Sequence, residues 1–139
     1  MRTGYTMLEL LIILAVTGIL AGISIPALIG MRDRITVRMA AIDTGRALAD
    51  ARTVALTASR RTAVRIDTIA NTVSVFSGAD TIRVLHLAEY GVRMQTTRDS
   101  IAFGPTGIGW GAATATITLT RGSASTALAV SRLGRIRRA

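Results

Sequence analysis

The stretch that decides the fold runs from Gly4 to Met31 and reads GYTMLELLIILAVTGILAGISIPALIGM. Its last 22 residues, beginning at Leu10, carry no formal charge. As a helix that rises about 1.5 Å per residue, such a segment crosses the roughly 30 Å hydrocarbon core of a bilayer. Glu9 lies at its leading edge, where an ionisable group is costly and usually has a defined partner. The stretch therefore predicts a membrane-spanning helix that begins beside one carboxylate with an assigned role.

Two simpler interpretations compete for this N-terminus. A cleaved secretory signal opens with basic residues and has an apolar stretch of about 7–15 residues, so the longer stretch here, with Glu9 at its edge, fits poorly. A plain anchor helix is compatible with the composition. Glu9 argues against both, because neither a signal nor an anchor needs a carboxylate there.

The composition limits the remaining possibilities. The chain has 139 residues, with 17 basic and 8 acidic side chains and a net charge of +9, and every basic residue is arginine. The length fits one domain beyond the apolar segment, and the lack of cysteine excludes a disulfide scaffold or a thiol nucleophile. Residues 32–65 carry a net charge of +5, residues 66–120 of −1 and residues 121–139 of +5. The basic character therefore lies after the apolar stretch and at the C-terminus.

After the apolar stretch the helix is predicted to continue to about Ala58, for a total length of roughly 80 Å. Mostly small side chains recur at alternating steps of four and three, the spacing of one helical face. This face consists of Val37, Ala41, Thr44, Leu48, Ala51, Ala55 and Ala58. Because small residues allow close approach, we expect this face to pack on the protein's own β-sheet.

From Arg61 the sequence period changes to two, which is typical of strands. Short stretches rich in threonine and valine alternate with turn-like segments. The predicted strands cover residues 62–66, 72–76, 81–85, 92–95, 113–120 and 127–131. The predicted fold class is α+β, a long N-terminal helix packed on a C-terminal antiparallel β-sheet domain.

The N-terminus resembles the prepilin cleavage site of type IV pilins and type II secretion pseudopilins, on the residues Gly4-Tyr5-Thr6-Met7-Leu8-Glu9 and the apolar run after them. The resemblance implies that prepilin peptidase removes the leader Met1–Gly4 and methylates the new N-terminal residue, Tyr5. The absence of a side chain at Gly4 lets the backbone enter the protease cleft.

Two further residues take roles from the same resemblance. Glu9 would pair with the N-terminal amine of a neighbouring subunit, which relieves the cost of burying either charge alone and sets the register of the fibre. Pro26 matches a proline late in the span of this family. A proline there removes a backbone hydrogen bond and would kink or locally melt the helix.

The C-terminal half resembles the GspH/FimT branch of minor pilins. Residues 101–107, IAFGPTG, match a turn of that family, and residues 128–137, LAVSRLGRIR, match a strand that ends in Val-Ser and enters a Gly-Arg turn. The segment 107–111, GIGWG, departs from the pattern. The implied segments are 1–4 (leader), 5–31 (transmembrane and assembly half of the helix), 32–60 (amphipathic half) and 61–139 (β domain with a basic tail).

The resemblance also implies a place and partners. The protein would cross the bacterial inner membrane once, with its C-terminal domain extracytoplasmic, and join other pilins or pseudopilins in a hetero-oligomeric fibre. It would act in a type II secretion pseudopilus or a type IV pilus, at the tip or in initiating assembly, with secreted cargo as a possible contact. Arg32 and Arg34 make the segment after the span more basic than the leader, which favours the opposite orientation, but this rule weakens when a whole domain is translocated.

The sequence holds no catalytic constellation, so we expect neither an enzyme nor a cofactor. His86 is the only histidine, which leaves no second imidazole for a metal site, and we expect it to be packed or on the surface. The segment Gly104–Gly111 is rich in glycine but lacks the lysine of a phosphate-binding loop. Trp110 is expected to fold over the core, with an exposed contact residue as the alternative.

The arginines near the C-terminus are the remaining feature. If residues 134–138 are extended, Arg135 and Arg137 point to one face and Ile136 points inward, while Arg132 and Arg138 add charge at the same end. Arginine suits phosphate oxygens, and some FimT-like proteins are thought to bind DNA through a Gly-Arg-x-Arg element, which residues 134–137 match. DNA uptake in natural transformation is therefore the alternative function. A solubilising tail in an arginine-biased genome is the simpler explanation.

Overall fold

The computed structural model describes residues 5–111 and 113–138. In that range it contains one long helix, α1 (Met7–Thr57), a short 3₁₀ helix, η1 (Leu87–Tyr90), and eight strands. The strands are β1 (Thr62–Asp67), β2 (Thr72–Ser77), β3 (Asp80–His86), β4 (Arg93–Thr96), β5 (Ser100–Phe103), β6 (Ala115–Arg121), β7 (Ala124–Val130) and β8 (Ile136–Arg138). The chain divides into two compact units, Met1–Arg32 and Asp33–Ala139, and α1 contributes to both.

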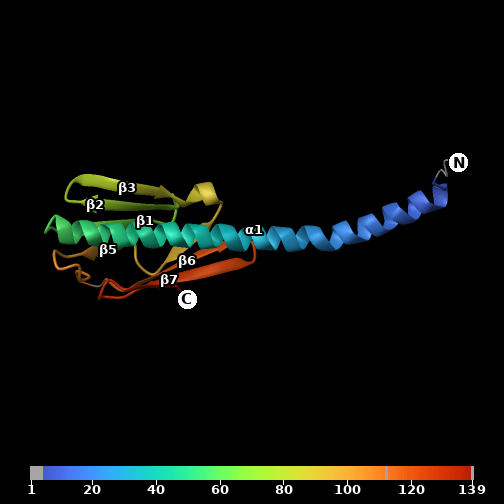
Figure 1. The fold of residues 1–139 in the computed structure, drawn as a ribbon. Helices are drawn as coiled ribbons and strands as arrows, with labels where there is room; N and C mark the ends of the chain where they lie inside the picture. Colours follow the sequence, from blue (N-terminus) through green and yellow to red (C-terminus); the bar gives the residue numbers. More distant parts are fainter. Residues whose placement is uncertain (1–4, 112, 139) are drawn as a thin grey trace. The chain divides into compact units, whose positions relative to one another are not determined.

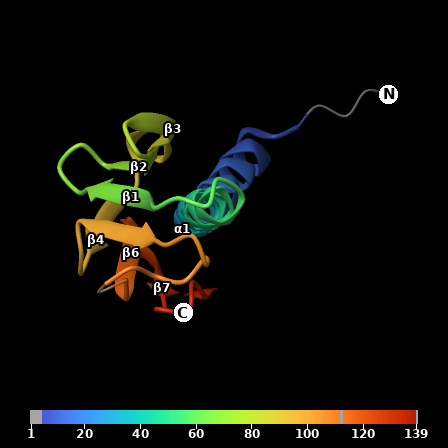
Figure 2. The same ribbon diagram turned by 90° about the vertical axis from the view of Figure 1, so that its left-hand side faces the viewer.

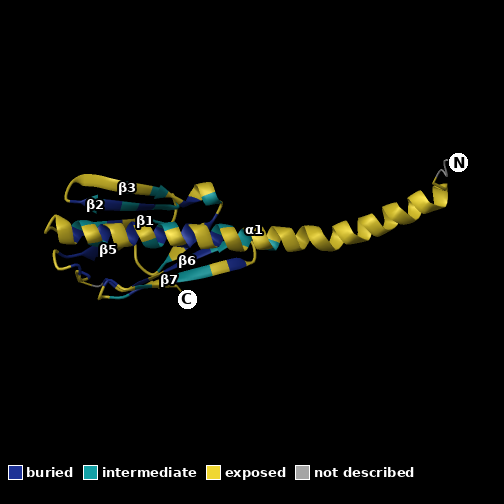
Figure 3. Ribbon diagram, viewed as in Figure 1, coloured by how far each residue is buried: buried dark blue, intermediate teal, exposed yellow. Residues whose placement is uncertain are grey.

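The described part of the first unit is the N-terminal half of α1. Its side chains are exposed almost throughout, as the yellow ribbon of this half in Figure 3 shows. Among the described residues, α1 is the one helix long and apolar enough to cross a membrane. An apolar surface of this extent needs either lipid or other protein surfaces to cover it.

The second unit packs the C-terminal half of α1 against two antiparallel sheets. One sheet has the strand order β3-β2-β1-β5 and the other β4-β6-β7-β8. Figure 1 shows the strands alongside α1, and Figure 2 shows that both sheets lie on the same side of it. The predicted fold, a long helix on an antiparallel β domain, is confirmed, and the domain is built from two four-stranded sheets within the described range.

The buried face of α1 is wider than the sequence pattern. The prediction is correct from Val37 to Ala55 but wrong at Ala58, which is exposed because α1 ends at Thr57. The face also includes two alanines that the pattern left out, since two sheets cover a broader arc of the helix than one. The buried residues of α1 are Val37, Ala40, Ala41, Thr44, Ala47, Leu48, Ala51 and Ala55.

The strands depart from the prediction most clearly at β5, which was not predicted, and at the start of β7, while β6 begins at Ala115 instead of residue 113. The segment expected to be a turn contains β5, which pairs with β1 so that Ile101 lies opposite Val64. β7 begins at Ala124, three residues earlier than predicted, because Gly122 adopts a left-handed φ of 54° and permits a short turn between β6 and β7. A short alternating pattern does not reveal either feature.

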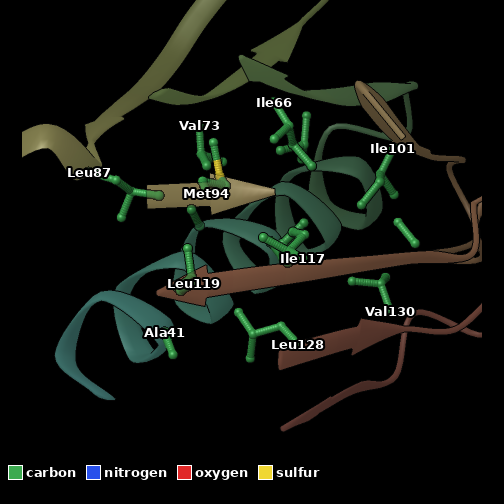
Figure 4. Close-up of a cluster of buried hydrophobic side chains, with 14 of the residues drawn as sticks. Ala41, Ile66, Val73, Leu87, Met94, Ile101, Ile117, Leu119, Leu128 and Val130 are labelled. Atoms are coloured by element: carbon green, nitrogen blue, oxygen red, sulfur yellow. The ribbon is translucent and has the colours of Figure 1, made fainter. Parts of the chain in front are cut away.

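The core is shared by both sheets and the helix. Figure 4 shows Ile66 and Val73 of one sheet and Ile117 and Leu119 of the other gathered in one cluster beside α1. Phe103 at the end of β5 is completely buried. Removal of such side chains from water provides most of the stabilisation of a domain of this size.

Polar side chains at the rim of this core connect α1 to two strands and to η1. The three connections are Asp33 Oδ1 to Arg121 Nε at 2.9 Å, Asp43 Oδ2 to the Tyr90 hydroxyl at 2.6 Å, and Asp50 Oδ2 to Arg83 Nη1 at 2.7 Å. The Tyr90 hydroxyl donates its proton to Asp43, which raises the pKa of Tyr90 above its usual value. Arg121 also donates to the Tyr90 carbonyl oxygen. Together these contacts fix the position of the helix along the sheets.

We predict that Ala51→Leu destabilises the full chain in detergent micelles by about 1–3 kcal/mol, because Ala51 is fully buried and extra methylene groups would overpack the interface. Urea unfolding followed by circular dichroism measures the change. Ala49→Leu is the matched control, since Ala49 is exposed on the same helix and should change stability by less than about 0.5 kcal/mol. Equal losses from the two variants would contradict close packing on this face.

Candidate functional site

Glu9 is held at the start of α1 by reciprocal hydrogen bonds with Thr6. Glu9 Oε2 accepts from the Thr6 amide at 2.7 Å and from the Thr6 hydroxyl at 3.0 Å. The Glu9 amide in turn donates to the Thr6 hydroxyl at 3.2 Å. This is a capping box, which satisfies two amide donors that the first helical turn leaves without partners. Both bonds to the carboxylate use Oε2, and Glu9 Oε1 receives no hydrogen bond from the described residues.

The other residues predicted at the N-terminus lie around this cap. Tyr5 precedes it and is 77% exposed. Gly4 lies outside the described residues, so cleavage after Gly4 and methylation of Tyr5 stay predictions. Pro26 lies inside α1, which continues without interruption on both sides of it. Local melting of the helix at Pro26 is therefore not seen in the single subunit, and a role for this proline in the assembled state stays a prediction.

A hydrogen-bonded turn between β7 and β8 presents the C-terminal arginines. The Ser131 amide donates to the Arg135 carbonyl at 2.8 Å, and the Gly134 amide donates to the Ser131 carbonyl at 2.9 Å. The Arg135 amide donates to the Ser131 hydroxyl at 3.2 Å. Gly134 has a φ of 72°, which favours glycine at this position. The Val-Ser and Gly-Arg elements of the sequence thus form the two sides of one hairpin turn.

The strand register separates the four C-terminal arginines. Arg137 lies opposite the exposed Ala129, whereas Arg138 lies opposite the buried Leu128. Directly opposite residues share a face, so Arg137 is on the outer face of the sheet and Arg138 on the face toward α1. Arg135 is exposed two residues before Arg137, and Arg132 is exposed in the turn. Only Arg135 and Arg137 form the pair that the sequence predicts.

Arg138 instead lies beside two arginines of α1 that the sequence analysis did not assign to a site. Arg34 and Arg38 are four residues apart, which places them on the same face of a helix, so this spacing could have indicated the pair. The three arginines line a hollow of about 400 Å³ between α1 and the start of β7. We call it the arginine hollow and define it by Arg34, Arg38, Arg138, Ser123, Ser125 and Thr126.

The glycine-rich loop packs against the same hairpin and against α1. Arg52 Nε donates to the Gly107 carbonyl at 3.0 Å, and the Gly109 amide donates to the Arg132 carbonyl at 2.8 Å. Trp110 is 58% exposed and its ring lies against Gly104, so the expectation that it folds over the core is wrong. The Trp110 amide donates to the Ala102 carbonyl at 2.7 Å, and the ring lies over Gly104, where no side chain occupies the space, so the loop leaves the ring exposed.

No protein-family model matches the sequence, and neither does any curated protein. Solved structures do match. The type IV minor pilin FimU of Pseudomonas aeruginosa superposes with a TM-score of 0.64 at 17% identity, covering 75% of this chain and 88% of FimU. This chain has the pilin-like fold. The minor pseudopilin EpsH of the Vibrio cholerae type 2 secretion system matches with a TM-score of 0.59 at 12% identity, covering 74% of this chain and 95% of EpsH.

In this pilin-like domain the remaining polar residues do not converge. His86 is exposed at the end of β3. In the described part of the chain no three side chains among histidine, aspartate and glutamate are grouped so that they could hold a metal ion. The structural features that distinguish the chain are therefore the capped Glu9, the C-terminal hairpin and the arginine hollow.

We predict that Gly107→Ala destabilises the full chain more than Gly111→Ala. Both glycines have positive φ, 71° and 66°, so each substitution incurs the backbone strain of about 1–2 kcal/mol. Only at Gly107 would the new methyl group also meet the Leu56 side chain, at 2.9 Å. Urea unfolding of the two variants measures the difference, and equal losses would show that the contact with Leu56 is unimportant.

Proposed function

We propose that the protein is a minor pilin or pseudopilin of the GspH/FimT type, a structural subunit of a type IV pilus or of a type II secretion pseudopilus. One observation carries this proposal: a pilin-like domain continues into an exposed apolar helix whose first turn holds Glu9. The structural likeness to both a minor pilin and a minor pseudopilin supports the general class. A place at the tip of the fibre or in the initiation of assembly is part of the proposal.

The proposed mechanism begins in the inner membrane, where the apolar half of α1 anchors the subunit with its β domain outside the cytoplasm. Prepilin peptidase cleaves after Gly4 and methylates Tyr5. During assembly the apolar half moves from lipid into the fibre and packs against the helices of other pilins or pseudopilins. Its exposed side chains are then covered by protein instead of lipid.

Glu9 would set the register of this packing. Its Oε2 is occupied by the cap on Thr6, while Oε1 accepts no bond from the described residues and is available to a neighbouring subunit. The amine of a neighbour's Tyr5 would form an ion pair with it, which offsets the cost of moving both charges out of water.

We predict that Glu9→Gln leaves prepilin cleavage intact but lowers incorporation into fibres by more than about tenfold, because an unpaired buried charge costs about 3–5 kcal/mol. Glutamine can still form the capping box, so this variant removes the charge and not the helix cap. The protein content of sheared fibres, compared with that of the membrane fraction, measures incorporation.

The control Thr6→Val breaks the cap but keeps the carboxylate, and it should incorporate better than Glu9→Gln. Normal incorporation of Glu9→Gln would reject the proposed pairing. Equal loss in both variants would assign the role of Glu9 to the helix start alone.

The outer face of the C-terminal hairpin supports a second candidate function, the capture of DNA for uptake in natural transformation. Arg135 and Arg137 are both exposed there, and neither forms a salt bridge within the described ranges. The planar guanidinium group binds phosphate oxygens in a bidentate manner. The threonine-rich surface of the sheet beside them presents no acidic side chain on β6, β7 or β8.

If DNA is the ligand, the double variant Arg135→Ala with Arg137→Ala should bind duplex DNA more weakly and reduce the salt dependence by about two counterions, roughly one for each lost phosphate contact. Fluorescence anisotropy at several salt concentrations measures both quantities. The matched pair Arg61→Ala with Arg65→Ala removes the same charge from exposed positions just before and within β1 of the other sheet. Equal losses from the two double variants would show that binding depends on net charge alone.

A further inference from the structure

The arginine hollow has the composition of an anion-binding site. It is lined by three guanidinium groups and by residues with hydroxyl side chains, with the buried Val37 at its base. Its volume of about 400 Å³ lies within the range of about 300–1,000 Å³ that is common for sites of small ligands. Its walls come from segments far apart in the sequence, the middle of α1, the β6–β7 turn and the last described strand.

The three arginines of the hollow lack the aspartate partner that several other arginines of the described chain have. Among residues 5–111 and 113–138, no side chain forms a salt bridge or a hydrogen bond with Arg34, Arg38 or Arg138. By contrast, Arg121 at the adjacent end of β6 is paired with Asp33. Like charges around one hollow repel each other, so an anionic ligand would relieve a cost that the protein itself leaves uncompensated.

The hollow also borders an open strand edge. β8 covers β7 only from Leu128 to Val130, so the described part of β8 leaves the edge of β7 uncovered from Ala124 to Ala127. Such an edge carries backbone amide groups without a partner strand. Thr126 lies on the inner face of β7, opposite the buried Leu119, and its hydroxyl forms no hydrogen bond with the described residues. Neutral donors therefore lie beside the three cationic ones.

The order of residues along the chain indicates the source of the anion. Arg34 and Arg38 follow the uncharged segment that ends at Met31 by three and seven residues. In a helix these separations correspond to about 5 and 10 Å, so Arg34 lies within a headgroup layer of about 5–8 Å beside the hydrocarbon core and the long side chain of Arg38 can reach back to it. Arg138 faces α1, away from the outer face that carries Arg137, so the hollow and the candidate DNA surface are distinct.

We propose that the arginine hollow binds the phosphate group of an anionic membrane phospholipid. This inference rests on the proposed storage of the subunit in the membrane. The guanidinium groups would bind the phosphate oxygens and the Thr126 hydroxyl would donate a further hydrogen bond. Binding would hold the β domain at the membrane surface until the subunit is extracted into a fibre, when the lipid is released.

Native mass spectrometry of the full chain in neutral detergent micelles tests this proposal. With phosphatidylglycerol the wild type should retain one lipid in preference to phosphatidylcholine. The triple variant Arg34→Gln, Arg38→Gln and Arg138→Gln should weaken retention of phosphatidylglycerol by at least about tenfold, since each fork-shaped contact to phosphate is lost. The control triple variant Arg61→Gln, Arg65→Gln and Arg93→Gln removes the same charge from exposed positions and should change retention less than about twofold.

A variant with unchanged charge tests the site itself. Thr126→Val should weaken retention by about threefold, because it removes one donor of the hollow and leaves the charge unchanged. Equal losses in the two triple variants, or no preference over phosphatidylcholine, would overturn the proposal. Displacement of the lipid by millimolar inorganic phosphate would keep the phosphate site but overturn its assignment to lipid. Loss of duplex DNA binding in the Arg34, Arg38 and Arg138 variant, with lipid retention intact, would assign the hollow to DNA instead.

Membrane fractionation separates this inference from the proposed function. Every variant keeps the apolar half of α1 and should sediment with the membranes. If the wild type itself fails to sediment, the proposed membrane storage fails. If it sediments but retains phosphatidylglycerol no better than the triple arginine variant does, the proposed function stands and the lipid site fails.

Discussion

Close contact between α1 and the two sheets is the constraint on which the domain depends. Ala40, Ala47, Ala51 and Ala55 have no exposed surface, so the helix backbone approaches the strands as nearly as methyl side chains permit. Larger side chains from both sheets, such as Phe103, then fill the space beside the helix. Interiors are packed at nearly crystalline density, so a face of small residues and a sheet of large ones are complementary. Without that complementarity the two sheets would have no common core.

The sequence of α1 divides near Arg32 into an exposed apolar half and a half that packs on the sheets. From Asp33 onward, aspartates on α1 form bonds to strands and to η1, which fix the helix on its domain. Before Arg32 the described side chains are mostly apolar and exposed, which suits lipid or the helices of other subunits. Glu9 is the charged side chain among them, and its capping bonds to Thr6 stabilise the helix end while leaving one oxygen available.

Much of this organisation could be predicted from local patterns. The length of the uncharged stretch predicts the exposed apolar helix, and the change of period near Arg61 predicts the first strand, β1. The position of Glu9 three residues after Thr6 predicts its place in the first helical turn. These features depend on neighbours along the chain, so the sequence carries them directly. The exposure of Trp110 could not be predicted from the sequence, because large aromatic side chains are usually buried. In the structure the loop places the ring on Gly104.

The sequence by itself determined the apolar helix, its capped start and the alternation of the strands, because helix and strand periods are local properties of the chain. Only the tertiary structure decided that β5 pairs with β1. It also decided that Arg138 lies on the opposite face of the sheet from Arg137, beside Arg34 and Arg38. Those outcomes depend on register and on contacts between segments up to a hundred residues apart. A one-residue change of register exchanges the two faces of a strand, so no local pattern could assign them.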